Sequence, residues 1–342
     1  MHGHMKNELG SRASAQMLNL LAGAWVSQAI SVAASLRIAD HLRDGPKSCE
    51  VLAEATRTNP GALYRLLRAL AATQVFAELE DGRFCLTPLA ECLISGKEGS
   101  LRAYATMLGA EEMWRPVGGM LASVRSGEPV FERIFGMTNF EYFASDPEVG
   151  RRFNEGMVSR SQEENRAVIE AYDFSRCATV VDVGGGQGAL LSAILAATAT
   201  TRGILFDMPH VVAAARTEMA AQLGRCDFHE GDFFKALPAG GDLYILKKVI
   251  HDWDDERALA ILQCCRSAMP RSARLLLIEP VVAPGNDPSF NKLLDLLMLV
   301  ITQGGKERTE AEHRAMLSSA GFAAIRLIST NCPLSIIEAM PG

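Results

Sequence analysis

The segment Val180-Val181-Asp182-Val183-Gly184-Gly185-Gly186-Gln187-Gly188 decides the fold class of this chain. Its first four residues read as a buried strand, and its glycines form a turn in which the backbone can adopt positive φ and approach a ligand closely. A helical pattern follows directly, from Ala189 to Ala197. A strand, a glycine-rich turn and a helix in this order begin a βαβ unit with a ligand site at the turn.

The region after residue 176 continues this alternation of short apolar runs and helical patterns. Such alternation predicts an α/β, Rossmann-like domain with a mostly parallel sheet and helices on both faces. The last two strands are joined by the turn Asn331-Cys332-Pro333, which predicts an antiparallel hairpin at one edge. The expected strands are Thr179–Val183, Gly203–Phe206, Cys226–His229, Leu243–Leu246, Arg274–Ile278, Ala323–Thr330 and Leu334–Ala339.

The glycine spacing is compatible with two classes of cofactor. Gly184, Gly186 and Ala189 satisfy the dinucleotide pattern GxGxxG/A, which predicts an NAD-linked oxidoreductase. Asp182 together with Gly184, Gly186 and Gly188 satisfies the pattern of methyltransferases instead. Both patterns place Gly184 and Gly186 against the cofactor, so the loop by itself leaves the choice open.

Acidic residues after the next two strands favour the second class. Asp207 follows the second strand, where a carboxylate can bind both ribose hydroxyls. Asp232-Phe233 follows the third, where an acid and an aromatic face suit an adenine. With Asp182 they form a negative lining that suits a sulfonium cation and disfavours a pyrophosphate, which prefers helix N-termini and bare amides. We therefore expect S-adenosylmethionine as co-substrate.

The N-terminal part has the element order of a winged helix. Ser48 and Asn59-Pro60 are start signals for two helices, and Asp81-Gly82 is a hairpin signal. This order raises a third possibility, a ligand-sensing winged-helix regulator. Residues 37–91 carry seven basic and eight acidic side chains, however, whereas DNA binding requires a basic face. A dimerisation scaffold is the favoured interpretation.

Composition sets limits on partners and location. The 342 residues predict more than one domain, and a net charge of −6 argues against nucleic acid as a partner. Eight cysteines without a CxxC pair, and an N-terminus interrupted by charges, predict reduced thiols in the cytoplasm. Seven histidines without an HExxH motif predict no metal site.

One uncharged stretch, Ala13 to Leu36, is long enough to span a bilayer. Polar or small residues recur at every fourth position on one side of the predicted helix, opposite an apolar side that includes Leu18, Leu21 and Trp25. Because polar residues are costly in lipid, we expect this helix to be buried between two subunits of a homodimer rather than in a membrane.

Five motifs together resemble the caffeic acid O-methyltransferase type of class I S-adenosylmethionine-dependent O-methyltransferase and its bacterial natural-product relatives. The resemblance covers nearly the whole chain. It implies a dimerisation domain at 1–99, a helical connector at 100–175 that contributes to the substrate pocket, and a methyltransferase domain at 176–342. The motifs are Phe206-Asp207-Met208-Pro209-His210-Val211, Gly231-Asp232-Phe233-Phe234, His251-Asp252-Trp253, Ile278-Glu279-Pro280 and Gly304-Gly305-Lys306-Glu307-Arg308-Thr309.

The resemblance also implies roles for individual residues. One departure is Lys248, which stands where plant members commonly carry an aromatic residue, and a second is a weak match over 113–132. The implied cofactor contacts are Gly184, Asp207, Asp232, Phe233, Lys247 and Ser161; the implied catalytic residues are His251, Glu279 and Glu307; the implied pocket residues are Met157, Met298 and Asp252.

His251 follows the strand Leu243–Leu246 at the edge where ligands bind in open α/β sheets. With a pKa near 6.5, a histidine is neutral at pH 7 and can accept the proton of a small, hydroxylated aromatic substrate. We expect Glu307 to fix its tautomer and Glu279 to form a second wall. Purely structural roles are the alternative: Glu279 ends a strand, and Glu307 precedes a helix that Thr309 and Glu312 cap.

Overall fold

The computed structural model describes residues 2–222 and 224–342. The chain divides into two compact units, Met1–Trp114 with Pro147–Arg160, and Arg115–Asp146 with Ser161–Gly342. The region 100–175 is shared between the two units, so their boundaries differ from those of the three-part division, which stays a prediction.

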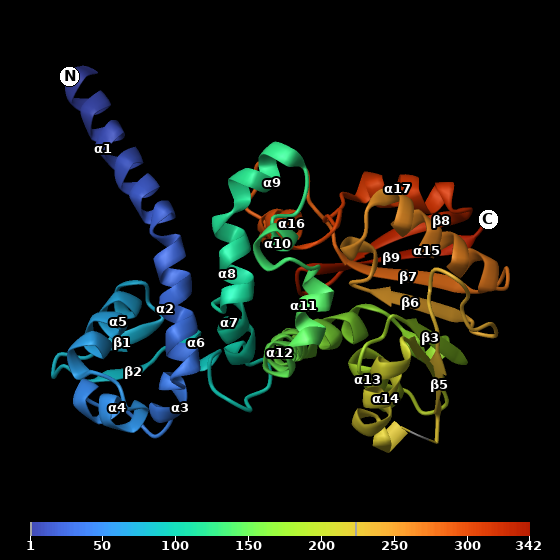
Figure 1. Cartoon of the computed structure of the whole chain (residues 1–342), viewed down its shortest axis with the longest axis horizontal. Helices are drawn as coiled ribbons and strands as arrows, with labels where there is room; N and C mark the ends of the chain where they lie inside the picture. The colour runs from blue at the N-terminus through green and yellow to red at the C-terminus, as the bar shows by residue number, and fades with distance from the viewer. Residues whose placement is uncertain (1, 223) are drawn as a thin grey trace. The chain divides into compact units, whose positions relative to one another are not determined.

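The first unit contains three short helices followed by a hairpin, the order expected from the sequence (Figure 1). The Ser48 hydroxyl accepts a hydrogen bond from the Val51 amide at 3.4 Å, and Asn59 accepts one from Ala62 at 3.0 Å, so both helix starts are capped. Its elements are α1 (His2–Leu21), α2 (Gly23–Ser35), α3 (Ile38–His41), α4 (Cys49–Thr56), α5 (Pro60–Ala72), β1 (Phe76–Glu78), β2 (Phe84–Leu86), α6 (Pro88–Glu91) and α7 (Arg102–Leu108), with the first half of α8 (Glu111–Gly118) and the first part of α12 (Pro147–Ala171).

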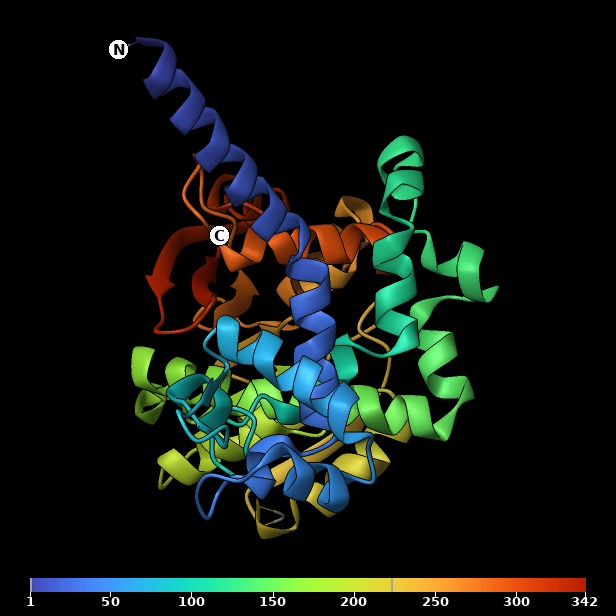
Figure 2. The same ribbon diagram turned by 90° about the vertical axis from the view of Figure 1, so that its left-hand side faces the viewer.

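The uncharged stretch forms two helices rather than the one that was expected. Helices α1 and α2 meet at Ala22 and are bent by 41° (Figure 2). Their apolar side is exposed in the single chain, by 66% at Leu18 and Leu21 and by 76% at Trp25, whereas Ser31 on the other side is buried. By length and composition no single described helix is able to cross a membrane, and the bent pair Arg12–Leu21 and Gly23–Ser35 meets that criterion only jointly.

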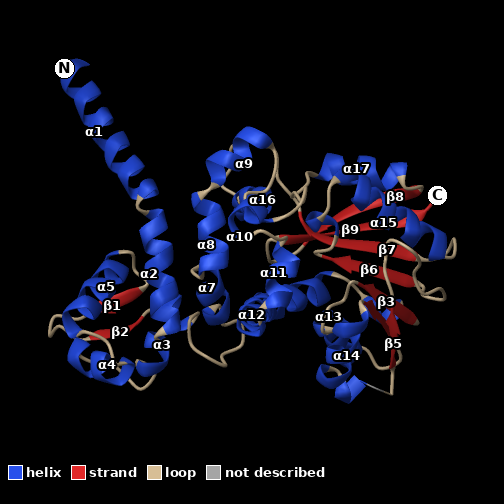
Figure 3. Ribbon diagram, in the orientation of Figure 1, coloured by secondary structure: helices blue, strands red, loops and turns tan. Residues whose placement is uncertain are grey.

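The second unit is built on a seven-stranded sheet with helices on both sides (Figure 3). The strand order is β5-β4-β3-β6-β7-β9-β8, parallel except for β8 and β9. The strands are β3 (Thr179–Val183), β4 (Arg202–Asp207), β5 (Cys226–Glu230), β6 (Leu243–Lys247), β7 (Arg274–Pro280), β8 (Phe322–Ser329) and β9 (Leu334–Pro341). The helical elements are α9 (Met120–Ser126), α10 (Phe131–Phe135), α11 (Asn139–Ser145), η1 (Phe174–Arg176), α13 (Ala189–Ala197), α14 (Pro209–Glu218), η2 (Ala220–Gln222), η3 (Ile250–Asp252), α15 (Asp255–Ala268), α16 (Phe290–Ile301) and α17 (Glu310–Ser319).

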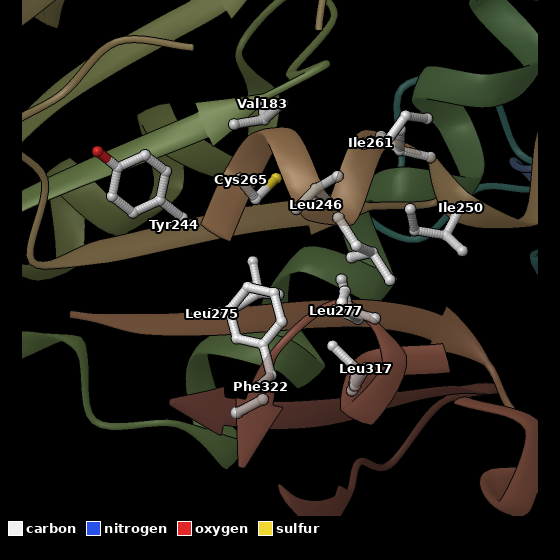
Figure 4. Packing of buried hydrophobic residues seen from close by; sticks show 14 of the residues in the cluster. Val183, Tyr244, Leu246, Ile250, Ile261, Cys265, Leu275, Leu277, Leu317 and Phe322 are labelled. Atoms are coloured by element: carbon white, nitrogen blue, oxygen red, sulfur yellow. The ribbon is translucent and has the colours of Figure 1, made fainter. Parts of the chain in front are cut away.

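All seven strands predicted for this unit are present within two residues of their expected ends. Their side chains alternate between two hydrophobic cores, as the pleat requires. Tyr244 and Leu246 of β6 join one core, in which Leu317 of α17 also packs (Figure 4), and Leu243 and Ile245 join the other. Burial on both faces explains why these strands read as continuous apolar runs rather than alternating ones.

The strand order reverses direction at β3 and β6, which are neighbours in the sheet although β4 and β5 lie between them in the chain. Crossovers leave β3 toward β4 on one side and β6 toward β7 on the other. A crevice at the carboxyl ends of the strands is expected at such a point, because the connecting segments turn away from each other. Ligand-binding residues should therefore follow β3, β4, β5 and β6.

The exposed apolar side of α1 and α2 generates a prediction about assembly. Leu21→Asp combined with Trp25→Asp should convert a homodimer into a monomer, because charges on an otherwise covered apolar face oppose association. Light scattering measures the mass. Leu79→Asp, at an apolar residue of the same unit that is 37% exposed, is the control and should stay dimeric. A wild-type chain that is monomeric at micromolar concentration would contradict the prediction.

Candidate active site

His251 lies in η3, just beyond the carboxyl end of β6, and is 8% exposed. Its Nδ1 is 2.9 Å from Oε1 of Glu307. In the neutral imidazole, Nδ1–H donates a hydrogen bond to that oxygen, which leaves the lone pair on Nε2. The arrangement is therefore suited to accepting a proton at Nε2.

Glu279 supports the segment that carries His251. It is the sixth residue of β7, fully buried, and its Oε1 accepts hydrogen bonds from the amides of Val249 at 3.2 Å and Ile250 at 2.9 Å. The structure thus brings Glu279 to the backbone under His251 rather than to the imidazole ring. Ligand atoms of His251, Glu279 and Glu307 lie within 4.8 Å of one another, and each of the three residues takes part in one of the hydrogen bonds just described.

The segment 304–307 is joined to the His251 segment through its backbone. The amide of Lys306 donates to the carbonyl of His251 at 2.9 Å, and the amide of Glu307 donates to Oδ1 of Asp295 at 2.8 Å. A Cβ at Gly305 would lie 2.6 Å from the carbonyl oxygen of His251, so this close approach requires glycine. Asp295 was not predicted as a site residue, because a single acidic residue within an apolar helix matches no sequence motif.

Arg308 connects the same two segments from inside the protein. Its side chain is 1% exposed and donates to the carbonyls of Ile250 at 2.9 Å and Trp253 at 2.8 Å. Asp255 accepts from it at 2.8 Å and neutralises the buried charge. The sequence placed Arg308 in a motif but indicated no role for it. Arg308 is more than 50 residues from Ile250 and Trp253 in the chain, and it meets their carbonyls only in the folded protein.

The charges around His251 correct one expectation. Burial by itself lowers the pKa of His251, but Asp252, the hydrogen bond from Glu307 and the nearby Glu279 outweigh it and raise the pKa to about 9. Asp252 Oδ1 lies 3.6 Å from Nε2. The expectation of a pKa near 6.5 was therefore wrong: in the free protein the imidazole is protonated at pH 7, because three carboxyl groups surround it.

The glycine loop and Asp207 form the side of the site at β3 and β4. Gly184 and Gly186 have φ of 67° and 58°, in the left-handed region, and a Cβ at Gly184 would lie 2.9 Å from Val249. Asp207 accepts hydrogen bonds from the amides of Gly186 at 2.9 Å and Met208 at 2.7 Å. The carboxylate thus holds the loop in place and remains at the edge where the ribose was predicted.

Two further predicted cofactor residues follow β5. Asp232 accepts a hydrogen bond from the Phe234 amide at 2.9 Å, and the Phe233 ring meets the Trp253 ring edge to face at 6.1 Å. Asp182, at the fourth position of β3, is 2% exposed and has one buried oxygen without a hydrogen-bond partner among the described residues. Burial raises the pKa of Asp182 to about 7, so this group gains from a cation nearby.

Lys247 ends β6 and belongs to a buried polar group that the sequence did not reveal. Its Nζ lies 2.6 Å from Oδ1 of Asn165 and 3.2 Å from Oε2 of Glu164, both in α12. Ser161 lies one helical turn before Asn165 and therefore on the same face of α12. The polar composition of α12 gave no signal that two of its residues are buried beside Lys247.

The predicted pocket residues are distributed between the two units. Met298 lies in α16 of the second unit and is 6% exposed, and Asp252 stands beside the imidazole of His251. Met157 lies in the part of α12 that belongs to the first unit. The contribution of all three to one substrate pocket stays a prediction.

Comparisons with known proteins agree with this geometry. Residues 118–323 match the O-methyltransferase domain, and residues 18–96 match the O-methyltransferase dimerisation domain. The chain is 46% identical to phenazine O-methyltransferase PhzM of Lysobacter antibioticus over 96% of each chain. It is 36% identical to 3-amino-4-hydroxybenzoate 4-O-methyltransferase of Streptomyces cremeus, over 91% of this chain and 85% of that one.

A solved structure extends the likeness to the cofactor. CalO1, a methyltransferase in calicheamicin biosynthesis solved in an SAH-bound form, has a TM-score of 0.89 and 35% identity, covering 97% of this chain and 98% of that one. These relatives give no support to an NAD-linked oxidoreductase or to a winged-helix regulator. The dimerisation domain supports a homodimer. The chain belongs to the S-adenosylmethionine-dependent O-methyltransferases, enzymes that methylate small aromatic natural products.

Proposed function

We propose that His251 is the general base of this O-methyltransferase and takes the proton of the acceptor hydroxyl at Nε2. The observation that carries the proposal is the 2.9 Å hydrogen bond between Nδ1 and Glu307, which fixes the ring and leaves Nε2 as the proton acceptor. Asp252, 3.6 Å from Nε2, stabilises the imidazolium that forms once the proton has moved. Proton removal makes the hydroxyl oxygen a stronger nucleophile.

The raised pKa of His251 matches this task. A phenol has a pKa near 10, so transfer of its proton to a group with a pKa of about 9 is nearly balanced in free energy. A histidine with an ordinary pKa would be a weaker base for the same proton. The cost is that the imidazole must lose a proton before each turnover at pH 7, which makes the rate depend on pH.

S-adenosylmethionine supplies an electrophilic methyl group on a sulfonium. We assign its binding to Gly184, Gly186, Asp207, Asp232, Phe233, Lys247 and Ser161. Two observations support the fit: Asp182 keeps a buried oxygen without a protein partner, and Gly184 leaves open a space that a Cβ would fill against Val249. Asp182 and Asp207 give this edge the negative potential that a sulfonium prefers.

Glu279 and Arg308 affect the reaction indirectly, because they position the backbone that carries His251. Glu279 fixes the amides before His251 and Arg308 fixes the carbonyls of 250 and 253, so the imidazole has little freedom to turn away. Alignment of a base and a nucleophile contributes to rate through effective molarity, and small displacements reduce it strongly. We assign Glu279 this orienting role.

We further propose a planar aromatic acceptor, as the names of the phenazine and hydroxybenzoate relatives suggest. Met157 and Met298 would pack against its ring, because flexible thioether side chains adapt to flat ligands. In this scheme residues 1–99 pair two subunits, 100–175 contribute to the substrate pocket, and 176–342 bind the cofactor.

The cofactor assignment predicts a selective loss of affinity. Wild-type protein should bind S-adenosylmethionine in calorimetry with ~−7 to −8 kcal/mol and show no heat with NAD. Asp207→Asn should weaken this binding by about 10-fold, because a charged acceptor is lost. Asp227→Asn, at a 58% exposed acid of the adjacent strand, serves as control and should bind normally. Tight NAD binding without a response to S-adenosylmethionine would contradict the assignment.

If His251 is the base, its loss should reduce the rate of methyl transfer without changing the affinity for S-adenosylmethionine. His251→Ala should lower kcat by ~10² or more, because the interaction acts in the transition state, and should leave the Kd of S-adenosylmethionine nearly unchanged. Glu307→Gln should cost less, because an amide still orients the ring. His229→Ala, at an exposed histidine of β5, is the matched control. Turnover in His251→Ala close to that of the wild type would show that proximity alone drives the reaction.

The raised pKa predicts a pH profile shifted toward alkaline values. Neutral imidazole is the active form, so kcat/KM should fall as pH decreases through the pKa of His251, which lies above 6.5 and reaches about 9 in the free protein. The profile should be recorded with a neutral phenolic acceptor at saturating S-adenosylmethionine. His251→Ala should lose this limb. A wild-type limb below pH 6, or one that persists in His251→Ala, would be inconsistent with the assignment.

A further inference from the structure

Lys248 has an unusual backbone conformation next to the catalytic segment. Its φ is 54°, in the left-handed region, which is unfavourable for a residue with a side chain. The conformation is held from the neighbouring strand, because the Lys248 amide donates to the Ile278 carbonyl at 3.0 Å. In an extended strand, successive side chains point to opposite faces; the turn at Lys248 ends that alternation.

As a result, two consecutive lysines reach the same carboxylate oxygen. Nζ of Lys247 lies 3.2 Å and Nζ of Lys248 3.4 Å from Oε2 of Glu164. The three side chains are 11%, 9% and 3% exposed, so water contributes little to their solvation. Burial, together with repulsion from Lys248, lowers the pKa of Lys247 to about 8 against the opposing pull of Glu164.

The ammonium group of Lys248 is poorly satisfied by the protein. It carries three N–H donors. Within residues 2–222 and 224–342 its one hydrogen bond is the long contact with Glu164, on an oxygen that Lys247 also approaches. A buried donor without an acceptor is unfavourable, and more so when the group is charged. Lys248 therefore has donors available for oxygen atoms of a ligand.

Those donors lie on the side of the site where the reaction takes place. Lys248 is close enough to Asp252 to oppose the rise in the pKa of Asp252 that burial causes, yet the two form no ion pair within 4.0 Å in the described part of the chain. Asp252 in turn is 3.6 Å from Nε2 of His251. Lys248 and Nε2 are thus both near Asp252, so a ring held at Nε2 can bring a second substituent toward Lys248.

We propose that Lys248 is a specificity-determining residue that binds an anionic oxygen, as in a ring carboxylate, on the acceptor. Two ammonium groups share one oxygen of Glu164, so Lys248 keeps hydrogen-bond donors that such an oxygen can accept. An aromatic side chain, which the family resemblance leads one to expect at this position, provides no donors for that purpose. The inference rests on the proposed function in one respect, that the acceptor hydroxyl is placed at Nε2.

The second substituent, and not the reacting hydroxyl, is the group that Lys248 binds. The hydroxyl oxygen must meet Nε2 of His251, and the hydrogen bond of Lys248 in the described part of the chain goes to Glu164 and not to that ring. An effect on the ionisation of the hydroxyl would change kcat for every acceptor. Binding of a second oxygen would change affinity only for acceptors that carry it. The two possibilities are therefore separable.

The test compares matched acids and amides on three skeletons, hydroxybenzoate, hydroxynaphthoate and hydroxyphenazine carboxylate. Calorimetry at pH 7 with saturating S-adenosylhomocysteine gives the affinity of each. Wild-type protein should prefer the acid to its amide on at least one skeleton by about 10- to 100-fold, the range of a hydrogen bond to a charged group. Lys248→Met, of similar length but uncharged, should lose this preference, and Lys248→Arg should retain part of it.

Lys97→Met removes one exposed lysine of the first unit, 45% exposed, and controls for the change in net charge. It should keep the preference for the acid. A wild-type chain that binds acids and amides equally on all three skeletons would overturn the proposal, as would a preference that survives in Lys248→Met. So would a fall in kcat for acid and amide alike with their affinity ratio unchanged. His251→Ala should keep the acid preference, so a wrong base and a wrong role for Lys248 give different results.

Discussion

The buried carboxylate of Glu279 is the constraint on which the catalytic segment depends. Its Oε1 accepts the amides of Val249 and Ile250, and no other described side chain reaches both. These bonds stop the backbone just after β6 from continuing as a strand. In the same turn, Lys248 has a left-handed φ, and His251 lies in η3 with its ring hydrogen-bonded to Glu307. One carboxylate thus supports the backbone between two functional side chains.

This support makes the protein sensitive to pH. Burial raises the pKa of Glu279 to about 7, well above its ordinary value near 4.5. An acid that holds its proton more tightly in the folded state lowers stability as pH rises from 4.5 toward 7, because the unfolded chain releases that proton more readily. His251 acts in the same direction over a higher range: its raised pKa stabilises the folded state below pH 6.5, and this contribution is lost as pH rises toward 9.

The site combines many ionisable groups in a small buried volume, which is common where proton transfer takes place. Carboxyl groups raise the proton affinity of His251, and lysines at the end of β6 balance part of their charge. Arg308 shows the structural counterpart: it is fully buried, but its donors are satisfied by two carbonyls and Asp255. Lys248 has fewer acceptors for its donors than Arg308 has. Arg308 therefore holds the backbone, whereas Lys248 is available to a ligand.

The sequence by itself determined the strands, the glycine turn and the residues at strand ends, since these depend on local patterns with periods of two and 3.6 residues. It also identified His251 and Glu307, whose pairing the structure places at 2.9 Å. Only the tertiary structure decided what depends on contacts distant in sequence: the pKa of His251, the support by Asp295 and Arg308, and the shared contact of Lys247 and Lys248 with Glu164, 83 and 84 residues away in the chain. Electrostatic free energy depends on distance and burial, and neither is encoded in the local pattern.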